Sequence, residues 1–134
     1  MKEIEFIQTA RQTIAIIIRA SYSPRETTFI SPNTHEQQVG FVVYPAQGYI
    51  QAHKHVPIER HIKSTSETLV VRKGRAEALL YDDNQELIAE RILELGDILV
   101  LVSGGHGFRM LEDTVLLEIK QGPYTSLAEK EHFQ

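Results

Sequence analysis

Three of the chain's six histidines lie within nine residues, at His53, His55 and His61. Neutral imidazole is a common ligand of divalent transition metals. Residues two apart in a strand point to the same side, about 6.5 Å from each other, so the imidazoles of His53 and His55 can reach one ion. We therefore treat both as candidate metal ligands, although a lone His-x-His is more often a pair of surface histidines.

Two other segments supply further donors at the ends of expected strands. Glu67 begins an apolar stretch that leads to a turn at Gly74. The pair Gly96-Asp97 opens a second apolar stretch that runs into a glycine-rich turn before His106. Three imidazoles and one carboxylate would leave one or two positions open on a divalent metal, as in catalytic sites.

These residues, taken in order, resemble the two motifs of the cupin superfamily. The first motif is matched by Gly48, His53, His55, Glu67 and Gly74, and the second by Gly96-Asp97 through His106. The resemblance covers roughly residues 37–124. It implies a single-domain β-barrel of the jelly-roll type (a double-stranded β-helix) over residues 1–134, with strands in 1–36 preceding the core and a short tail at 125–134. It also implies a metal held by His53, His55, Glu67 and His106.

The chain departs from the cupin pattern at two places. The first departure provides a second candidate for the carboxylate ligand. The stretch from His55 to Glu67 is longer than usual, and Glu59 lies at the commoner spacing after His55. We prefer Glu67, because it alone places Gly74 correctly; Glu59 and His61 then belong to a loop beside the site. The second motif is a residue short, has Val102-Ser103-Gly104-Gly105 where a proline-containing turn is common, and has Met110 where asparagine is frequent.

Several short segments of the sequence are also similar to small cupins from bacterial surface-polysaccharide gene clusters. These segments are EQQVG (36–40), STSE (64–67), GGHGF (104–108) and EIKQGPY (118–124). This similarity implies a sugar-related substrate. The metal could be Zn, Fe, Mn, Ni or Co, because nitrogen and oxygen ligands do not select among them.

The composition argues against several other classes of protein. The formal net charge is −4 and no basic run is present, so we expect no nucleic-acid partner. The chain has no cysteine, which excludes disulfides and thiolate zinc sites and agrees with a reducing compartment. The segment MKEIEFIQTARQ does not have the pattern of a secretory signal, and the apolar run Ile14–Ile18 is far too short to span a bilayer. We expect a soluble, cytoplasmic protein without a membrane partner.

The hydrophobic pattern predicts an all-β fold. Short apolar runs alternate with turn residues, as in sandwiches and barrels. We expect turns at 45–48, 73–74, 82–84 and 103–105, with those at 73–74 and 82–84 closing hairpins, and a short helix at 126–133. The expected strands are Thr13–Arg19, 37–45, 49–56, runs within 68–92, the run after Asp97, and 114–120.

Two residues of the last expected strand are candidates for proton transfer. Leu116, Glu118 and Lys120 share one side of this strand, and Val115, Leu117 and Ile119 share the other. If the first side faces inward, Glu118 and Lys120 could act as an acid and a base; the alternative is that they face solvent. Glu118 and His61 are our candidate catalytic residues.

Together these features predict a metal-dependent enzyme that acts on a sugar or nucleotide sugar by isomerase or epimerase chemistry. An Fe(II)-dependent dioxygenase and a non-catalytic metal-dependent sugar-binding module are the alternatives. No serine elbow or cysteine nucleophile is present.

The strand expected at Thr13–Arg19 also predicts a homodimer. It is almost entirely apolar rather than alternating, so both of its faces require cover, and a second subunit could supply one of them. The alternative is a fully buried strand in a monomer.

Overall fold

The computed structural model describes residues 2–123 and 129–134. These residues are all-β: they form ten strands in antiparallel sheets and no helix. The strands are β1 (Ile4–Gln8), β2 (Thr13–Ile18), β3 (Thr28–Phe29), β4 (Gly40–Phe41), β5 (Glu67–Lys73), β6 (Ala76–Tyr81), β7 (Leu87–Leu93), β8 (Ile98–Leu101), β9 (Gly105–Met110) and β10 (Val115–Lys120).

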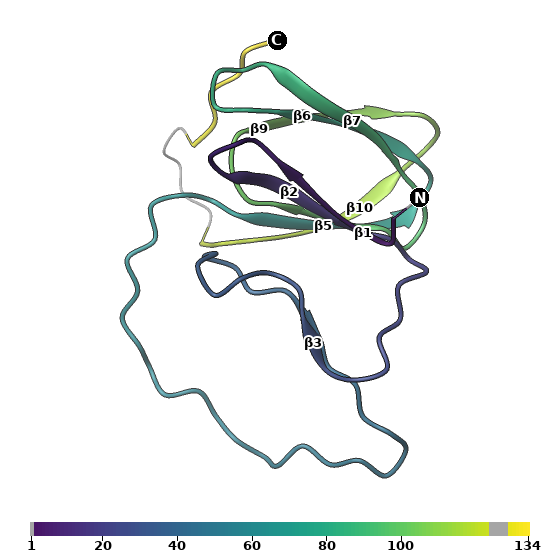
Figure 1. Ribbon diagram of the computed structural model, residues 1–134, viewed down its shortest axis with the longest axis vertical. Coiled ribbons are helices and arrows are strands. Elements are labelled where there is room, and N and C mark those ends of the chain that lie inside the picture. The colour runs from purple at the N-terminus through teal and green to yellow at the C-terminus, as the bar shows by residue number, and fades with distance from the viewer. Residues whose placement is uncertain (1, 124–128) are drawn as a thin grey trace. The chain divides into compact units, whose positions relative to one another are not determined.

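The chain divides into two compact units, and each is described by itself. The first unit, residues 1–22 and 65–134, contains a five-stranded sheet in the order β1-β2-β8-β5-β10 and a three-stranded sheet in the order β7-β6-β9. Figure 1 shows these sheets as two facing layers. The second unit, residues 23–64, contains the short pair β3-β4.

A hydrophobic core fills the space between the two sheets of the first unit. Ile17, Leu69 and Leu99 come from the larger sheet, and Leu80 and Leu93 come from the smaller one; all are almost fully buried. On β5 the core residues Leu69 and Val71 are two apart, so the alternation places Glu67 on the same inward side. The larger sheet therefore presents a carboxylate at one end of its apolar face.

The turn at 73–74 differs from the prediction. Gly74 lies there with a φ of +84°, but β5 and β6 do not pair with each other. This turn instead carries the chain from one sheet to the other, because both strands place apolar side chains in the shared core. The turn at 82–84 does close a hairpin, since β6 and β7 pair along their length. The turn before β9 is also present, with Gly104 at a φ of +70°.

The strand predicted at 49–56 is not present, and the prediction was wrong. Residues 49–63 pair with no other described strand and carry exposed side chains. Of the strand expected at 37–45, only Gly40–Phe41 forms a ladder, with Thr28–Phe29. β-branched and aromatic residues favour a strand, but without a partner for backbone hydrogen bonds the segment stays irregular. The turn predicted at 45–48 is present, and Gly48 N donates to Pro45 O at 2.9 Å.

The predicted strand at Thr13–Arg19 is confirmed as β2. It lies inside the larger sheet, with β1 on one side and β8 on the other, and Ile14 to Ile18 are 0% exposed. This burial agrees with the alternative that β2 is a buried strand of one subunit. Both faces of β2 are covered without a second subunit, so its apolar sequence no longer requires a partner. The homodimer itself stays a prediction.

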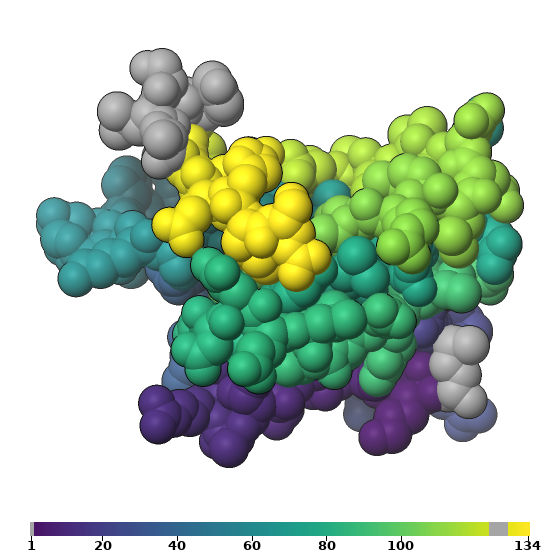
Figure 2. Space-filling view, turned by 90° about the horizontal axis from the view of Figure 1, so that it is seen from above, coloured from purple at the N-terminus to yellow at the C-terminus, as the bar shows by residue number. Residues whose placement is uncertain are grey.

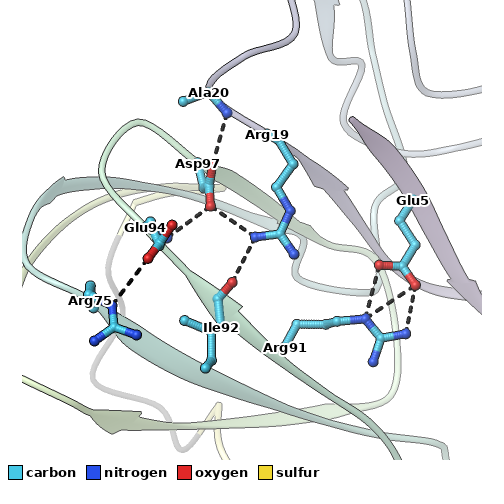
Figure 3. A network of polar contacts seen from close by, with 8 residues as sticks. All are labelled: Glu5, Arg19, Ala20, Arg75, Arg91, Ile92, Glu94 and Asp97. Atoms are coloured by element: carbon cyan, nitrogen blue, oxygen red, sulfur yellow. Dashed lines mark hydrogen bonds and ion pairs between the residues drawn. The ribbon is translucent and has the colours of Figure 1, made fainter. Parts of the chain in front are cut away.

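Polar contacts fix the ends of the sheets to each other (Figure 3). The buried carboxylate of Asp97 accepts hydrogen bonds from Ala20 N (2.8 Å), Glu94 N (2.8 Å) and Arg19 Nη1 (2.9 Å). Arg91 on β7 pairs with Glu5 on β1 at 2.6 Å and so connects the edges of the two sheets. The hydrogen bond to Arg91 lowers the pKa of Glu5.

The predicted helix at 126–133 falls partly on residues 124–128, which lie outside the described residues. Residues 129–133 of that segment have no helical turn. No helix among the described residues is long and apolar enough to cross a membrane.

Candidate functional site

Glu67 and His106 lie next to each other across the two sheets of the first unit. Glu67 is the first residue of β5, and His106 is the second residue of β9. Glu67 Oε1 is 3.4 Å from His106 Nε2, and the side chains are 16% and 33% exposed. Two residues predicted as metal ligands from separate motifs are therefore neighbours at one end of the core.

Strand β10 brings a second carboxylate to the same place. Leu116 packs against the core, so Glu118 shares the inward side of β10, while Val115, Leu117 and Ile119 are exposed. Glu118 and Lys120 are nevertheless exposed themselves, so only Leu116 on this side of the strand is partly buried. In the register of the sheet Glu118 lies opposite Leu69 and Lys120 lies opposite Glu67.

The two carboxyl groups have opposite pKa shifts because they share a hydrogen bond. The hydrogen bond from His106 is the largest cause that lowers the pKa of Glu67 to about 2, and the hydrogen bond with Glu118 lowers it further. The hydrogen bond with Glu67 raises the pKa of Glu118, and burial and the charge of Glu67 add to this rise. The pair therefore holds an ionised carboxylate on Glu67 beside a carboxyl on Glu118 that retains its proton to higher pH.

Such a pair is suited to proton transfer. Two titratable groups whose pKa values are pushed apart can act as a base and an acid at one pH. His106 lies against the same carboxylate and has a second ring nitrogen, so it is a third group that can move or hold a proton.

His53 and His55 form a pair of their own within the second unit. Their ring centroids are 5.5 Å apart with an angle of 70° between the planes, although no strand holds them. His53 Nδ1 is 2.8 Å from Gln51 O, and this contact leaves Nε2 as the free nitrogen of that ring. A carbonyl partner on one nitrogen is the usual arrangement for an imidazole that binds a metal through the other.

The predicted metal ligands thus occur as two pairs, one in each unit. Among residues 2–123 and 129–134 no three His, Cys, Asp or Glu side chains are grouped so that they could hold a metal ion. Each pair offers nitrogen or oxygen donors of the type that a divalent transition metal binds. The four-ligand metal centre stays a prediction.

The other candidate residues of the second unit lie on the segment without regular structure. Glu59 and His61 are both exposed there. The choice between Glu59 and Glu67 as carboxylate ligand therefore rests on the motif spacing, and a catalytic role for His61 stays a prediction.

Sequence reasoning missed two residues at this end of the first unit. Phe133 packs against Tyr81 on β6, with ring centroids 5.0 Å apart. The charge of Lys130 lowers the pKa of Glu118, against the larger effect of Glu67. The one signal that the sequence offered was a single aromatic residue within the polar run EKEHFQ.

Comparisons of the chain with protein-family models, with curated proteins and with solved structures give no match.

Proposed function

We propose that the chain is a metal-dependent cupin-like enzyme that acts on a small polar molecule, most simply a sugar or nucleotide sugar, by isomerase or epimerase chemistry. The observation that carries this proposal is the cluster of Glu67, His106 and Glu118 at one end of the core. Isomerisation and epimerisation need a group that removes a proton and a group that returns one. The carboxyl of Glu118, whose pKa is raised beside Glu67, is the candidate for this proton transfer.

The strand connections support a jelly roll. Along the chain, β5 belongs to the larger sheet, β6 and β7 to the smaller, β8 to the larger, β9 to the smaller and β10 to the larger. Repeated crossing between two antiparallel sheets is typical of jelly rolls.

In this proposal the metal ligands are His53, His55, Glu67 and His106. A divalent metal would supply a Lewis acid for a carbonyl or hydroxyl oxygen of the substrate. The protein's own contribution is proton transfer by Glu118, whose carboxyl keeps its proton to higher pH beside Glu67.

Elemental analysis of the purified protein, followed by a thermal-shift screen with nucleotide sugars, tests the proposal. We expect a stoichiometric transition metal and stabilisation by at least one sugar ligand. A turnover assay of that ligand with Glu118→Gln should then show a loss of about 100-fold or more, as for a general acid or base. A protein without metal that no sugar stabilises would overturn the proposal, whereas oxygen consumption would point to a dioxygenase.

A further inference from the structure

Strand β10 is an edge of the larger sheet. It is the last strand in the order β1-β2-β8-β5-β10, and among the described strands it pairs with β5 alone. The backbone N–H and C=O groups of every second residue therefore point away from β5. An edge of this kind is a template for pairing with another strand.

The outer side of β10 is apolar and exposed. Val115, Leu117 and Ile119 share this side and are 51%, 43% and 49% exposed. Natural edge strands commonly carry charges that prevent association with another chain. No charge interrupts this side of β10, so it has the composition of a surface that another chain covers.

The other sheet edges of the first unit are less suited to a partner. β1 and β7 are joined by the ion pair between Glu5 and Arg91 at 2.6 Å, and Glu90 interrupts the exposed apolar side chains of β7. On β9 the residues on either side of His106 are glycines, which offer no side chain to a partner. The C-terminal tail also packs on the smaller sheet, and Figure 2 shows the tail in yellow against the green strands.

The inner side of β10 carries two opposite charges, Glu118 and Lys120, and both side chains are exposed. Lys120 lies opposite Glu67 in the ladder with β5. Opposite charges at facing positions of neighbouring strands are stabilising, and like charges are destabilising. These two charges therefore protect the edge from most strands, but a second copy of β10 can offer each of them the opposite charge.

The charges select one register for two antiparallel copies of β10. In a dimer with a two-fold axis perpendicular to the sheet, the residue on the axis faces its own copy. If Ile119 lies on the axis, Glu118 of each copy faces Lys120 of the other. If Glu118 lies on the axis, two carboxyl groups face each other. If Leu117 lies there, Glu118 faces the apolar Leu116, so the axis at Ile119 is the register with complementary charges.

We propose that the chain forms a homodimer through β10, with the two strands antiparallel about Ile119 and the larger sheets of the two copies joined into one. Lys120 then lies between Glu67 of its own copy and Glu118 of the other. Each copy thus contributes a cation beside the candidate site of its partner. On the outer side, the Leu117 and Ile119 side chains of both copies form one apolar cluster. This interface does not depend on the proposed function.

Single cysteines test the interface, because the chain contains no cysteine of its own. Ile119→Cys should form a disulfide-linked dimer under mild oxidation, since two residues that face each other across strands are close enough for a disulfide. Leu117→Cys should give little covalent dimer, because the axis at Ile119 keeps its two copies apart. Ile92→Cys, at a position of β7 that is 43% exposed, is the control. Electrophoresis without reductant measures the covalent dimer.

Two charge variants test the register. Lys120→Glu and Glu118→Lys each place like charges at both facing pairs, so each should raise the dissociation constant of the dimer about tenfold or more. An equal mixture of the two variants should dimerise again, because every facing pair then has opposite charges. Lys73→Glu, at the opposite end of β5, is the matched control and should dimerise as the wild-type chain does. Light scattering over a series of concentrations gives the dissociation constants.

The proposal is overturned if the wild-type chain stays monomeric at every concentration, or if Lys120→Glu dimerises as well as Lys73→Glu. A covalent dimer of Leu117→Cys in preference to Ile119→Cys would move the axis and overturn the register. Far-UV circular dichroism and thermal unfolding check that each variant is folded. Metal content and sugar binding of the wild-type chain report on the proposed function separately from these results.

Discussion

Glu67 and His106 are 39 positions apart in the sequence, yet Glu67 Oε1 lies 3.4 Å from His106 Nε2. One residue belongs to the larger sheet and the other to the smaller. Their contact therefore depends on the correct stacking of the two sheets, and it ties the chemistry of the candidate site to the folding of the first unit.

Acid should weaken the fold through Glu67. Its folded pKa is lowered from 4.5 to about 2, first by the hydrogen bond from His106. Since this folded pKa is below the unfolded one, the stabilisation is complete above about pH 4.5 and is lost as the pH falls towards 2. A shift of this size corresponds to about 3 kcal/mol at most. The raised pKa of Glu118 acts in the opposite sense, because its stabilisation is present at low pH and is lost as the pH rises through the folded pKa, so the net loss is smaller than this bound.

Urea unfolding of chelator-treated protein between about pH 2 and pH 6 measures this effect. The wild-type chain should lose more stability across this window than Glu67→Gln, which cannot titrate at this position. Parallel pH profiles for the two proteins would contradict the prediction.

Removal of a predicted imidazole ligand should strip metal from the protein. His53→Ala, His55→Ala and His106→Ala should each lower the metal content to a small fraction of the wild-type value, because fewer donors bind a divalent ion more weakly. Elemental analysis after dialysis gives the metal content, and His132→Ala, outside both motifs, is the control. Full occupancy in His106→Ala would remove that residue from the ligand set.

The choice between the two candidate carboxylates can be made by spectroscopy. In cobalt-substituted protein, Glu67→Gln should shift the visible absorption bands and weaken cobalt binding, because the carboxylate ligand is lost. Glu59→Gln should leave the spectrum nearly unchanged. The opposite result would assign the ligand to Glu59 and show that the first motif is aligned wrongly.

The buried carboxylate of Asp97 should matter more for stability than the exposed ion pairs. Asp97→Ala leaves the Arg19 guanidinium and two backbone N–H groups without their acceptor, and we expect a loss of about 3 kcal/mol in the free energy of unfolding. Arg75→Gln breaks an ion pair whose side chains are 43% and 63% exposed, and should cost less than about 1 kcal/mol. Chemical denaturation of both variants makes the comparison, and equal losses would show that the Asp97 contacts contribute little.

A charge placed in the middle of β2 should unfold the protein. Ile16 is 0% exposed and lies between Phe6 and Val100 in the larger sheet, so Ile16→Asp would bury an unpaired carboxylate. We expect loss of the cooperative thermal transition, whereas Leu117→Asp on exposed β10 should remain folded. A folded Ile16→Asp protein of half the wild-type mass would place β2 at a subunit interface instead.

Light scattering of the wild-type chain tests the predicted homodimer directly. A mass about twice the 15.3 kDa of one chain would support the dimer. A mass near that of one chain would discard it.

The sequence by itself determined the class of the fold and the positions of several turns. Short runs with a period of two predicted an all-β chain, and the turn residues at 45–48, 82–84 and 103–105 predicted turns that the structure contains. These features are local, because side-chain alternation and the left-handed conformation of a glycine such as Gly104 depend on neighbouring residues. The sequence also singled out Glu67 and His106 by residue type and position at strand ends, and Glu118 by the alternation of the last strand.

Only the tertiary structure decided which strands pair and which of these side chains meet. A turn at Gly74 is compatible with a β5–β6 hairpin and with a crossing from one sheet to the other. The packing of Leu69 and Leu80 in one core places β5 and β6 in different sheets. The register of β10 on β5 then places Glu118 within hydrogen-bonding reach of Glu67, which gives the two carboxyl groups their opposite pKa shifts. Strand pairing and sheet stacking join residues far apart in the chain, and no local pattern around 49–56 could show that this segment pairs with no described strand.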